Sequence, residues 1–131
     1  MVLDTSAVLA ILQDEPERRK FNEAIEEAAS RSLSAASLVE CSMILESRYG
    51  SDAVRDLDLW IAKAQITIAP VDEEQANLAR RAFKTYGKGR HPAALNFGDC
   101  CSYALSRALD EPLLFKGNDF SQTDVERHPA S

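Results

Sequence analysis

The chain has 131 residues, of which 45% are hydrophobic and 27% are charged. This length suits one ordinary domain, and the composition excludes disordered, fibrous and membrane-spanning classes of protein. We therefore expect a single domain over residues 1–131 that does not associate with membranes.

The charge balance is acidic, with 15 Lys and Arg against 21 Asp and Glu and a net charge of −6. A protein that passively coats nucleic acid needs a basic surface, so this class is disfavoured. An enzyme that acts on nucleic acid through cations bound to its acids remains possible. The cysteines lack zinc spacing and no signal peptide opens the chain, so we expect a cytoplasmic protein with reduced thiols at Cys41, Cys100 and Cys101.

Short apolar runs alternate with longer runs of helical periodicity. In chain order the predicted elements are a strand at 1–4, helices at 7–13 and 17–30, a strand at 31–35, helices at 38–49 and 51–64, a strand at 65–69, helices at 72–86 and 99–108, and a strand at 113–115. Strands that alternate with helices favour an α/β sandwich around a parallel sheet, and the short strands predict that helix dominates.

Several polar residues mark the ends of these helices. Thr5 or Ser6 is predicted to cap the first helix, and Ser37 with Glu40 has the spacing of a capping box for the third. Gly50 is a natural stop for that helix, and Asp72 is predicted to cap the helix that follows the third strand.

Acidic residues follow the predicted strands. Asp4 and Asp119 come after the first and last strands, Glu40 opens the helix after the second strand, and Asp99 begins a late helix. If the strands are parallel, the four carboxylates share one edge of the sheet, where they would repel one another unless a cation joined them. An all-oxygen set suits Mg²⁺ or Mn²⁺. Each acid taken alone is equally explained as a helix cap or a loop residue.

A run of basic residues provides a second candidate surface. Residues 80–91 contain no acid, and Lys116 lies near Asp119. Glycines in the 87–91 loop let the backbone approach a ligand closely, so we interpret this loop as a phosphate-contacting lip. The alternative is a solvated helix end. The candidate phosphate-binding residues are Lys84, Lys88, Arg90, His91 and Lys116.

Taken together, these segments resemble PIN domains and, within them, the VapC toxins of bacterial toxin–antitoxin pairs. The resemblance spans nearly the whole chain and is carried by the order and spacing of Val2-Leu3-Asp4-Thr5-Ser6-Ala7, Ser37-Leu38-Val39-Glu40, Tyr86-Gly87-Lys88-Gly89-Arg90-His91, Leu95-Asn96-Phe97-Gly98-Asp99-Cys100 and Leu113-Leu114-Phe115-Lys116-Gly117-Asn118-Asp119-Phe120. It implies a PIN-like α/β/α sandwich with a short-stranded, mainly parallel central sheet.

The resemblance also implies an activity: Mg²⁺- or Mn²⁺-dependent hydrolysis of RNA phosphodiester bonds by an endoribonuclease. Asp4 and Asp99 would bind the ion directly, Glu40 would complete the site or orient water, and Asp119 would hold a second ion or a metal-bound water. Asp124 is a weaker substitute for Asp119. Residues that would hydrogen-bond these ligands or a phosphate oxygen are Thr5, Ser6, Asn96 and Asn118.

The same resemblance implies partners: an RNA substrate, a VapB-type antitoxin that inserts a segment toward the acids, and a second copy in a homodimer. The basic 87–91 loop is a possible antitoxin contact as well as a phosphate contact.

Two non-enzymatic binding modules are alternatives to the enzyme hypothesis. One is a catalytically silent PIN-like domain. The other is a receiver-like signalling domain, which requires adjacent acids after its first strand, whereas Thr5 and Ser6 follow Asp4 here. A phosphatase of the haloacid-dehalogenase type is also disfavoured, because Ser6 occupies the second acidic position of its motif.

Overall fold

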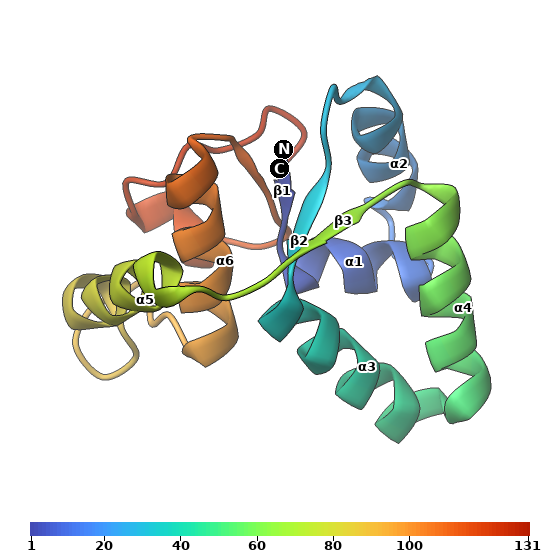
Figure 1. Cartoon of the computed structure of the whole chain (residues 1–131), viewed down its shortest axis with the longest axis horizontal. Helices are drawn as coiled ribbons and strands as arrows, with labels where there is room; N and C mark the ends of the chain where they lie inside the picture. The colour runs from blue at the N-terminus through green and yellow to red at the C-terminus, as the bar shows by residue number, and fades with distance from the viewer.

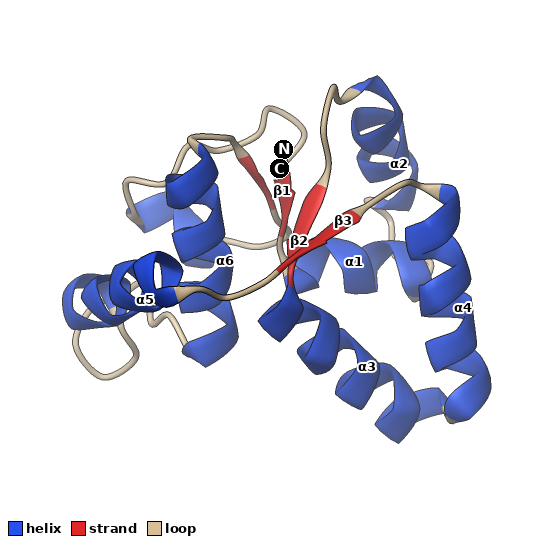
Figure 2. Ribbon diagram, in the orientation of Figure 1, coloured by secondary structure: helices blue, strands red, loops and turns tan.

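Four short parallel strands form a central sheet in the computed structural model, which describes residues 1–131 (Figures 1 and 2). In chain order the elements are β1 (Val2–Leu3), α1 (Thr5–Leu12), α2 (Arg18–Glu27), β2 (Ser32–Ser34), α3 (Ala35–Tyr49), α4 (Ser51–Lys63), β3 (Thr67–Ala69), α5 (Glu73–Tyr86), α6 (Phe97–Leu109), β4 (Leu113–Leu114) and the 3₁₀ helix η1 (Asp119–Gln122).

The strand order is β3-β2-β1-β4, so β1 lies between β2 and β4. Val2 is opposite Ser32 on one side and Leu113 on the other, and Leu3 is opposite Leu33 and Leu114. Because alternate residues of a strand point to opposite faces, this register sends two sets of apolar side chains to two separate cores. A parallel sheet that is buried on both faces is the expected result.

Each face of the sheet has its own group of helices (Figure 1). Leu3, Leu33 and Leu114 join the core formed with α1 to α4, whereas Val2 and Leu113 join the core formed with α5 and α6. This arrangement confirms the predicted helix-rich α/β/α sandwich with a parallel sheet. The apolar face of α4 packs into the first of these cores, through the buried Leu57 and the half-buried Trp60.

Two predicted helix starts are wrong. Asp4, and neither Thr5 nor Ser6, caps α1, because its side chain accepts a hydrogen bond from the Ser6 amide. The chain passes from β2 directly into α3, so Ser34 is the cap and the predicted capping box of Ser37 and Glu40 does not form.

Two other boundary signals, Gly50 and Asp72, behave as predicted. Gly50 separates α3 from α4 with a φ of +87°, a region that side chains disfavour. Asp72 caps α5 by accepting a hydrogen bond from the amide of Gln75. The late helix α6 begins two residues before its predicted start at Asp99, with Asn96 as its cap. Glu40 therefore lies in the second turn of α3 and Asp99 in the first turn of α6.

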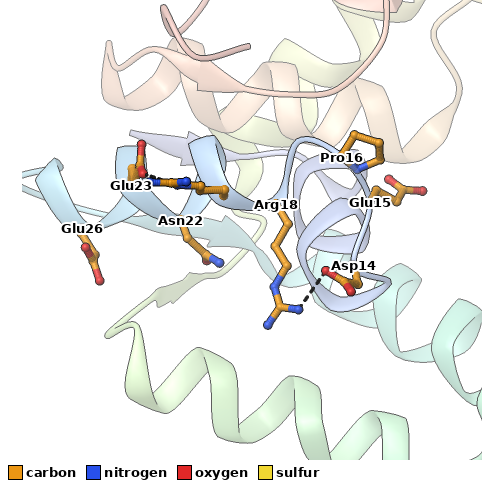
Figure 3. Close-up of a pocket in the computed structure, with 8 residues that line it drawn as sticks. Asp14, Glu15, Pro16, Arg18, Asn22, Glu23 and Glu26 are labelled. Atoms are coloured by element: carbon orange, nitrogen blue, oxygen red, sulfur yellow. Dashed lines mark hydrogen bonds and ion pairs between the residues drawn. The ribbon is translucent and has the colours of Figure 1, made fainter.

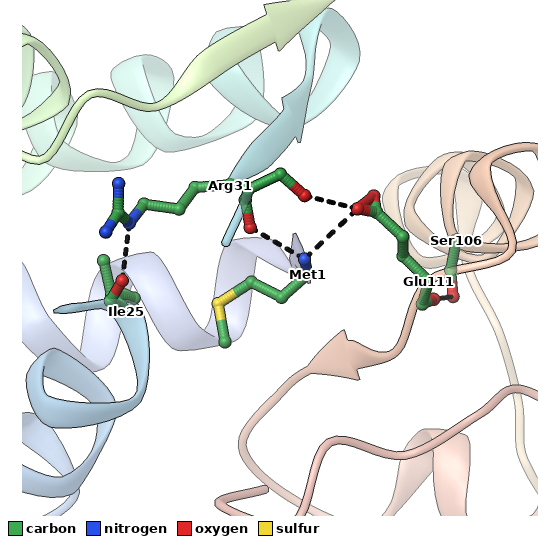
Figure 4. Close-up of polar contacts among 6 residues, drawn as sticks. Met1, Ile25, Arg31, Ser106 and Glu111 are labelled. Atoms are coloured by element: carbon green, nitrogen blue, oxygen red, sulfur yellow. Dashed lines mark hydrogen bonds and ion pairs between the residues drawn. The ribbon is translucent and has the colours of Figure 1, made fainter. Parts of the chain in front are cut away.

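The first residue is held at the start of the central strand by polar contacts (Figure 4). The amino group of Met1 donates to the carbonyl of Ser30 at 2.8 Å and lies 3.5 Å from the carboxylate of Glu111. Ser106 donates its hydroxyl to the Glu111 carbonyl at 2.6 Å. These contacts tie β1 to the start of β2 and to the connection between α6 and β4, which fixes where Asp4 leaves the sheet.

All three cysteines are buried and unpaired. None of the helices has both the length and the apolar character that a membrane span requires.

Candidate active site

The candidate site lies at the carboxyl ends of β1 and β4. The chain runs from β1 toward β2 and β3 before crossing back to β4, so the boundary between β1 and β4 is the switch point at which parallel sheets bind ligands. Asp4 leaves β1 at this boundary, and its amide donates to the Leu114 carbonyl at 3.0 Å. The Asp4 side chain is almost fully buried, with 2% of its residue surface exposed.

The two carboxylate oxygens of Asp4 have different surroundings. Oδ2 accepts hydrogen bonds from the amide and the hydroxyl of Ser6, at 3.0 and 2.6 Å. Oδ1 is buried and has no hydrogen-bond partner. A buried polar atom without a partner carries a substantial free-energy cost, so Oδ1 is an acceptor available to a ligand.

Asp99 is held by a reciprocal capping box at the start of α6. The Asn96 side chain accepts from the Asp99 amide at 2.9 Å, and Asp99 Oδ2 accepts from the Asn96 amide at 3.1 Å. Burial, followed by the negative charges of Asp4, Asp119 and Glu40, raises the pKa of Asp99 to about 7, against the lowering effect of the Asn96 hydrogen bond. The acids predicted from strand ends therefore act on one another across this site.

Glu40 reaches the same helix start from α3. A Cβ placed on Gly98 would lie 2.5 Å from Glu40 Oε1 and 2.6 Å from Oε2, so the carboxylate occupies the space that a side chain at Gly98 would fill. Gly98 thus leaves room for the carboxylate of Glu40, a role that the sequence prediction did not identify. The Gly98-Asp99 pair at the start of the predicted late helix is the signal that could have indicated it.

The site suits a hard cation by donor type. Its carboxylate oxygens are the ligands that Mg²⁺ and Mn²⁺ prefer, and the orphaned Asp4 Oδ1 and the raised pKa of Asp99 mark a site that lacks positive charge. The acids are near enough to influence one another's charge, but no three His, Cys, Asp or Glu side chains are grouped in an arrangement that could itself hold a metal ion.

The remaining predicted site residues differ in their surroundings. Thr5 is buried with its hydroxyl unpartnered, and exposed Asp119 begins η1. Exposed Asn118 makes no side-chain cap on η1. Asp124 is engaged elsewhere, because it accepts from the Tyr103 hydroxyl at 2.5 Å and pairs with Arg107 at 2.9 Å.

The predicted basic residues divide into two groups. Lys84, Lys88 and Arg90 are exposed, and Arg90 lies 5.6 Å from the centre of the Phe83 ring. By contrast, the Lys116 ammonium pairs with Glu15 and Glu17. His91 stabilises the turn in which it lies, since its Nδ1 accepts a hydrogen bond from the Ala93 amide at 3.0 Å.

A groove of about 850 Å³ runs between α5 and the start of α6. Its walls include apolar side chains from both helices and the basic side chains of Arg80, Lys84 and Arg90. Phe97 and Cys100 also line it, on either side of Gly98 and Asp99. The basic surface and the acidic site therefore meet at the first turn of α6.

This combination defines a parallel α/β protein with acids at the sheet switch point, beside a mainly apolar groove that also carries three basic side chains. The PIN domain family matches residues 1–126, and the chain is 48% identical over 125 residues to Ribonuclease VapC30 of Mycobacterium tuberculosis, covering 95% of each chain. The chain therefore belongs to the PIN domain family and, within it, to the VapC ribonucleases.

Two solved structures share the fold. The crystal structure of VapC20 from Mycobacterium tuberculosis, described as a sarcin–ricin-loop-cleaving toxin, superposes with a TM-score of 0.78 at 16% identity, over 97% of each chain. VapBC2 from Rickettsia felis, solved bound to a promoter DNA fragment, superposes with a TM-score of 0.74 at 12% identity, over 96% of this chain and 94% of that one.

Proposed function

We propose that this protein is the toxin of a type II toxin–antitoxin system, an endoribonuclease that hydrolyses RNA phosphodiester bonds with Mg²⁺ or Mn²⁺. The observation that carries the proposal is the group formed by Asp99 and three other acids: burial and then the charges of Asp4, Asp119 and Glu40 raise the pKa of Asp99, while Asp4 Oδ1 lacks a partner. The names of the relatives at 48% and 49% identity, all VapC ribonucleases, support it.

Asp4, Asp99 and Glu40 would hold the cation, with Asp119 contributing directly or through water. When bound, the ion lowers the pKa of its water ligand and offsets charge on the scissile phosphate. The protein prepares this site with its own residues. Ser6 fixes one oxygen of Asp4, Asn96 fixes the backbone and carboxylate of Asp99, and the proton that Asp99 holds near neutral pH must leave when a cation binds.

The basic side chains of the groove between α5 and α6 offer a path for the RNA backbone. Lys84 and Arg90 line it, and Lys88 lies in the exposed loop between them. Contacts of Lys and Arg with phosphates position a nucleic acid without reading its sequence. These residues would bring a phosphate to the acidic edge in spite of the net charge of −6. His91 and the side chains of Thr5 and Asn118 remain candidates for weaker contacts of the same kind.

A VapB-type antitoxin and a second copy of the chain are the proposed protein partners, in the cytoplasm. The Rickettsia felis structure is described as VapBC2, which supports an antitoxin for this fold. A basic antitoxin side chain directed at the acids would compete with the cation. Apolar side chains exposed on α3, among them Val39 at 57% and Met43 at 64%, provide surface for a homodimer.

The test combines metal binding with RNA cleavage. Calorimetry should detect Mn²⁺ binding to the wild-type protein and none to the Asp4→Ala/Asp99→Ala variant, with both folded by circular dichroism. RNA cleavage should stop with EDTA and with Asp99→Asn, and sequencing of fragment 5′ ends would identify the target. Equal Mn²⁺ binding by both proteins would refute the site, and binding without turnover on any RNA would indicate a silent PIN-like domain.

A further inference from the structure

Lys116 stands where β4 passes into the loop that bears Asp119. Its backbone amide donates to the hydroxyl of Ser6 at 3.0 Å, and that hydroxyl donates to Asp4 Oδ2 at 2.6 Å. The backbone at Lys116 is thus connected to the buried carboxylate of Asp4 through one side chain.

The side chain of Lys116 points to a different segment. Its ammonium lies 3.0 Å from a carboxylate oxygen of Glu15 and 3.1 Å from one of Glu17. The ammonium donates a hydrogen bond to Glu15 and forms an ion pair with Glu17, and these two contacts, Glu15 first, raise the pKa of Lys116 above its ordinary value. We call the three residues Lys116, Glu15 and Glu17 the clasp. The clasp joins segments about a hundred residues apart, since Glu15 and Lys116 are separated by 101 positions.

The turn that carries the two glutamates is itself well fixed. Asp14 has a φ of +55°, and the amide of Glu15 donates to the Ala10 carbonyl at 2.8 Å, which is the pattern that ends a helix in a left-handed residue. The Asp14 carboxylate pairs with Arg18 at 3.0 Å (Figure 3). Because this turn directly follows α1, its position relative to Asp4 is set by one short helix.

The loop beyond Lys116 has few other attachments. Gly117 has a φ of +96°, and the Asn118 carbonyl receives only local hydrogen bonds from Ser121. Phe120 is buried and packs on the Phe115 ring, with ring centres 5.1 Å apart. Asp119 therefore lies between two anchors, the Phe120 ring on one side and the clasp on the other.

We propose that Lys116 is a positioning residue, which holds the 116–119 segment to the turn after α1 and thereby fixes Asp119 relative to Asp4. This replaces the sequence-based interpretation of Lys116 as a phosphate contact, because its ammonium is already shared by two carboxylates. The proposal rests on the proposed cation site. It assigns to this lysine an effect on metal binding that passes through the loop and does not require contact with RNA.

Hydrogen exchange and Mn²⁺ calorimetry on the whole protein test the clasp. In Lys116→Met and in Glu15→Gln/Glu17→Gln, amides of residues 116–122 should exchange about three- to tenfold faster, as expected for the loss of one or two partly exposed ion pairs. Mn²⁺ affinity should fall in both variants by a similar factor. Lys116→Arg should restore both properties. Glu23→Gln, which removes the separate Arg19–Glu23 pair at 3.1 Å, is the matched control and should change neither.

The glutamate variant separates the clasp from RNA contact, because it leaves Lys116 intact and frees its charge. If Lys116 bound phosphate, this variant would bind a labelled RNA as well as the wild type or better, with unchanged exchange and unchanged Mn²⁺ affinity, and the clasp would be refuted. If the wild type binds Mn²⁺ no better than Asp4→Ala/Asp99→Ala, the proposed function fails. Exchange at 116–122 then decides the clasp alone, with faster exchange supporting it and unchanged exchange overturning it.

Discussion

Replacing Gly98 by alanine should disable the site while leaving the fold intact. The new Cβ would lie 2.5 and 2.6 Å from the two carboxylate oxygens of Glu40, whereas ordinary van der Waals contact begins at 3.4 Å. The close atoms belong to the end of a flexible side chain, so Glu40 can swing away and the backbone need not move. Gly98 also lies within the first turn of α6, where alanine should stabilise the helix by about 0.5–1 kcal/mol.

The cost should therefore appear in function. Glu40 must shift by nearly an ångström, and a misplacement of about 1 Å in a reacting site lowers rates by about a hundredfold, equivalent to roughly 2.7 kcal/mol. Metal–ligand distances tolerate only about 0.2 Å. We expect urea unfolding to show equal or higher stability for Gly98→Ala, while calorimetry shows weaker Mn²⁺ binding and cleavage assays show about a hundredfold slower RNA hydrolysis.

A double-mutant cycle checks the assigned cause. In a Glu40→Ala background no carboxylate remains for the Cβ to displace, so adding Gly98→Ala should produce no further loss of Mn²⁺ affinity or activity. If the effects of the two substitutions are fully additive, Gly98 does not make room for the Glu40 carboxylate. The same conclusion follows if Gly98→Ala alone binds Mn²⁺ and cleaves RNA like the wild type.

The charges and the burial of particular residues lead to three further predictions. Because the fold raises the pKa of Asp99 from 3.8 to about 7, protonation favours the folded state, and the free energy of unfolding of the metal-free protein should fall as the pH rises from about 4 to 7. After allowance for solvent screening the change should be about 1–3 kcal/mol in urea titrations, and it should be much smaller for Asp99→Asn. Burial raises the pKa of Cys41 to about 12 and of Cys100 to about 11, so a disulfide reagent at pH 8 should label the thiols only after denaturant is added. Asp124→Asn should lower stability by about 1–2 kcal/mol through the loss of its ion pair with Arg107 and of the charge that strengthens the hydrogen bond from Tyr103, with Mn²⁺ binding unchanged. A loss of Mn²⁺ binding in that variant would place Asp124 in the site.

The fold was predictable because it depends on patterns of short range. Alternating apolar strands and periodic helices indicate the layers, and signals such as Gly50 and Asp72 act on the residues next to them. The positions of the acids after the strands also followed from the sequence, since parallel strands bring their carboxyl ends to one edge. The strand order β3-β2-β1-β4 had to come from the structure, because several orders satisfy the same apolar pattern.

The two capping patterns show why a short sequence motif does not predict the roles of residues at the site. Ser37 with Glu40 and Asn96 with Asp99 have the same spacing, yet only the second pair forms a capping box. The difference arises outside each motif, because β2 continues without a break into α3 and moves the helix start to Ser34. Glu40 is thereby released from a capping role, and its carboxylate is free to reach Gly98.

Lys116 shows that neighbours in sequence do not identify the ion-pair partners of a charged side chain either. Its neighbours in sequence suggested a phosphate contact beside Asp119, but its partners, Glu15 and Glu17, lie about a hundred residues away. Among the Lys and Arg side chains, only Arg18, Arg19, Arg107 and Lys116 form ion pairs, and three-dimensional proximity decides which ones do. The cations that remain free on α5 and its following loop, Lys84, Lys88 and Arg90 among them, stand where no acid is near in sequence. An acid-free run of basic residues thus predicts exposed, unpaired cations better than a single lysine beside an acid does.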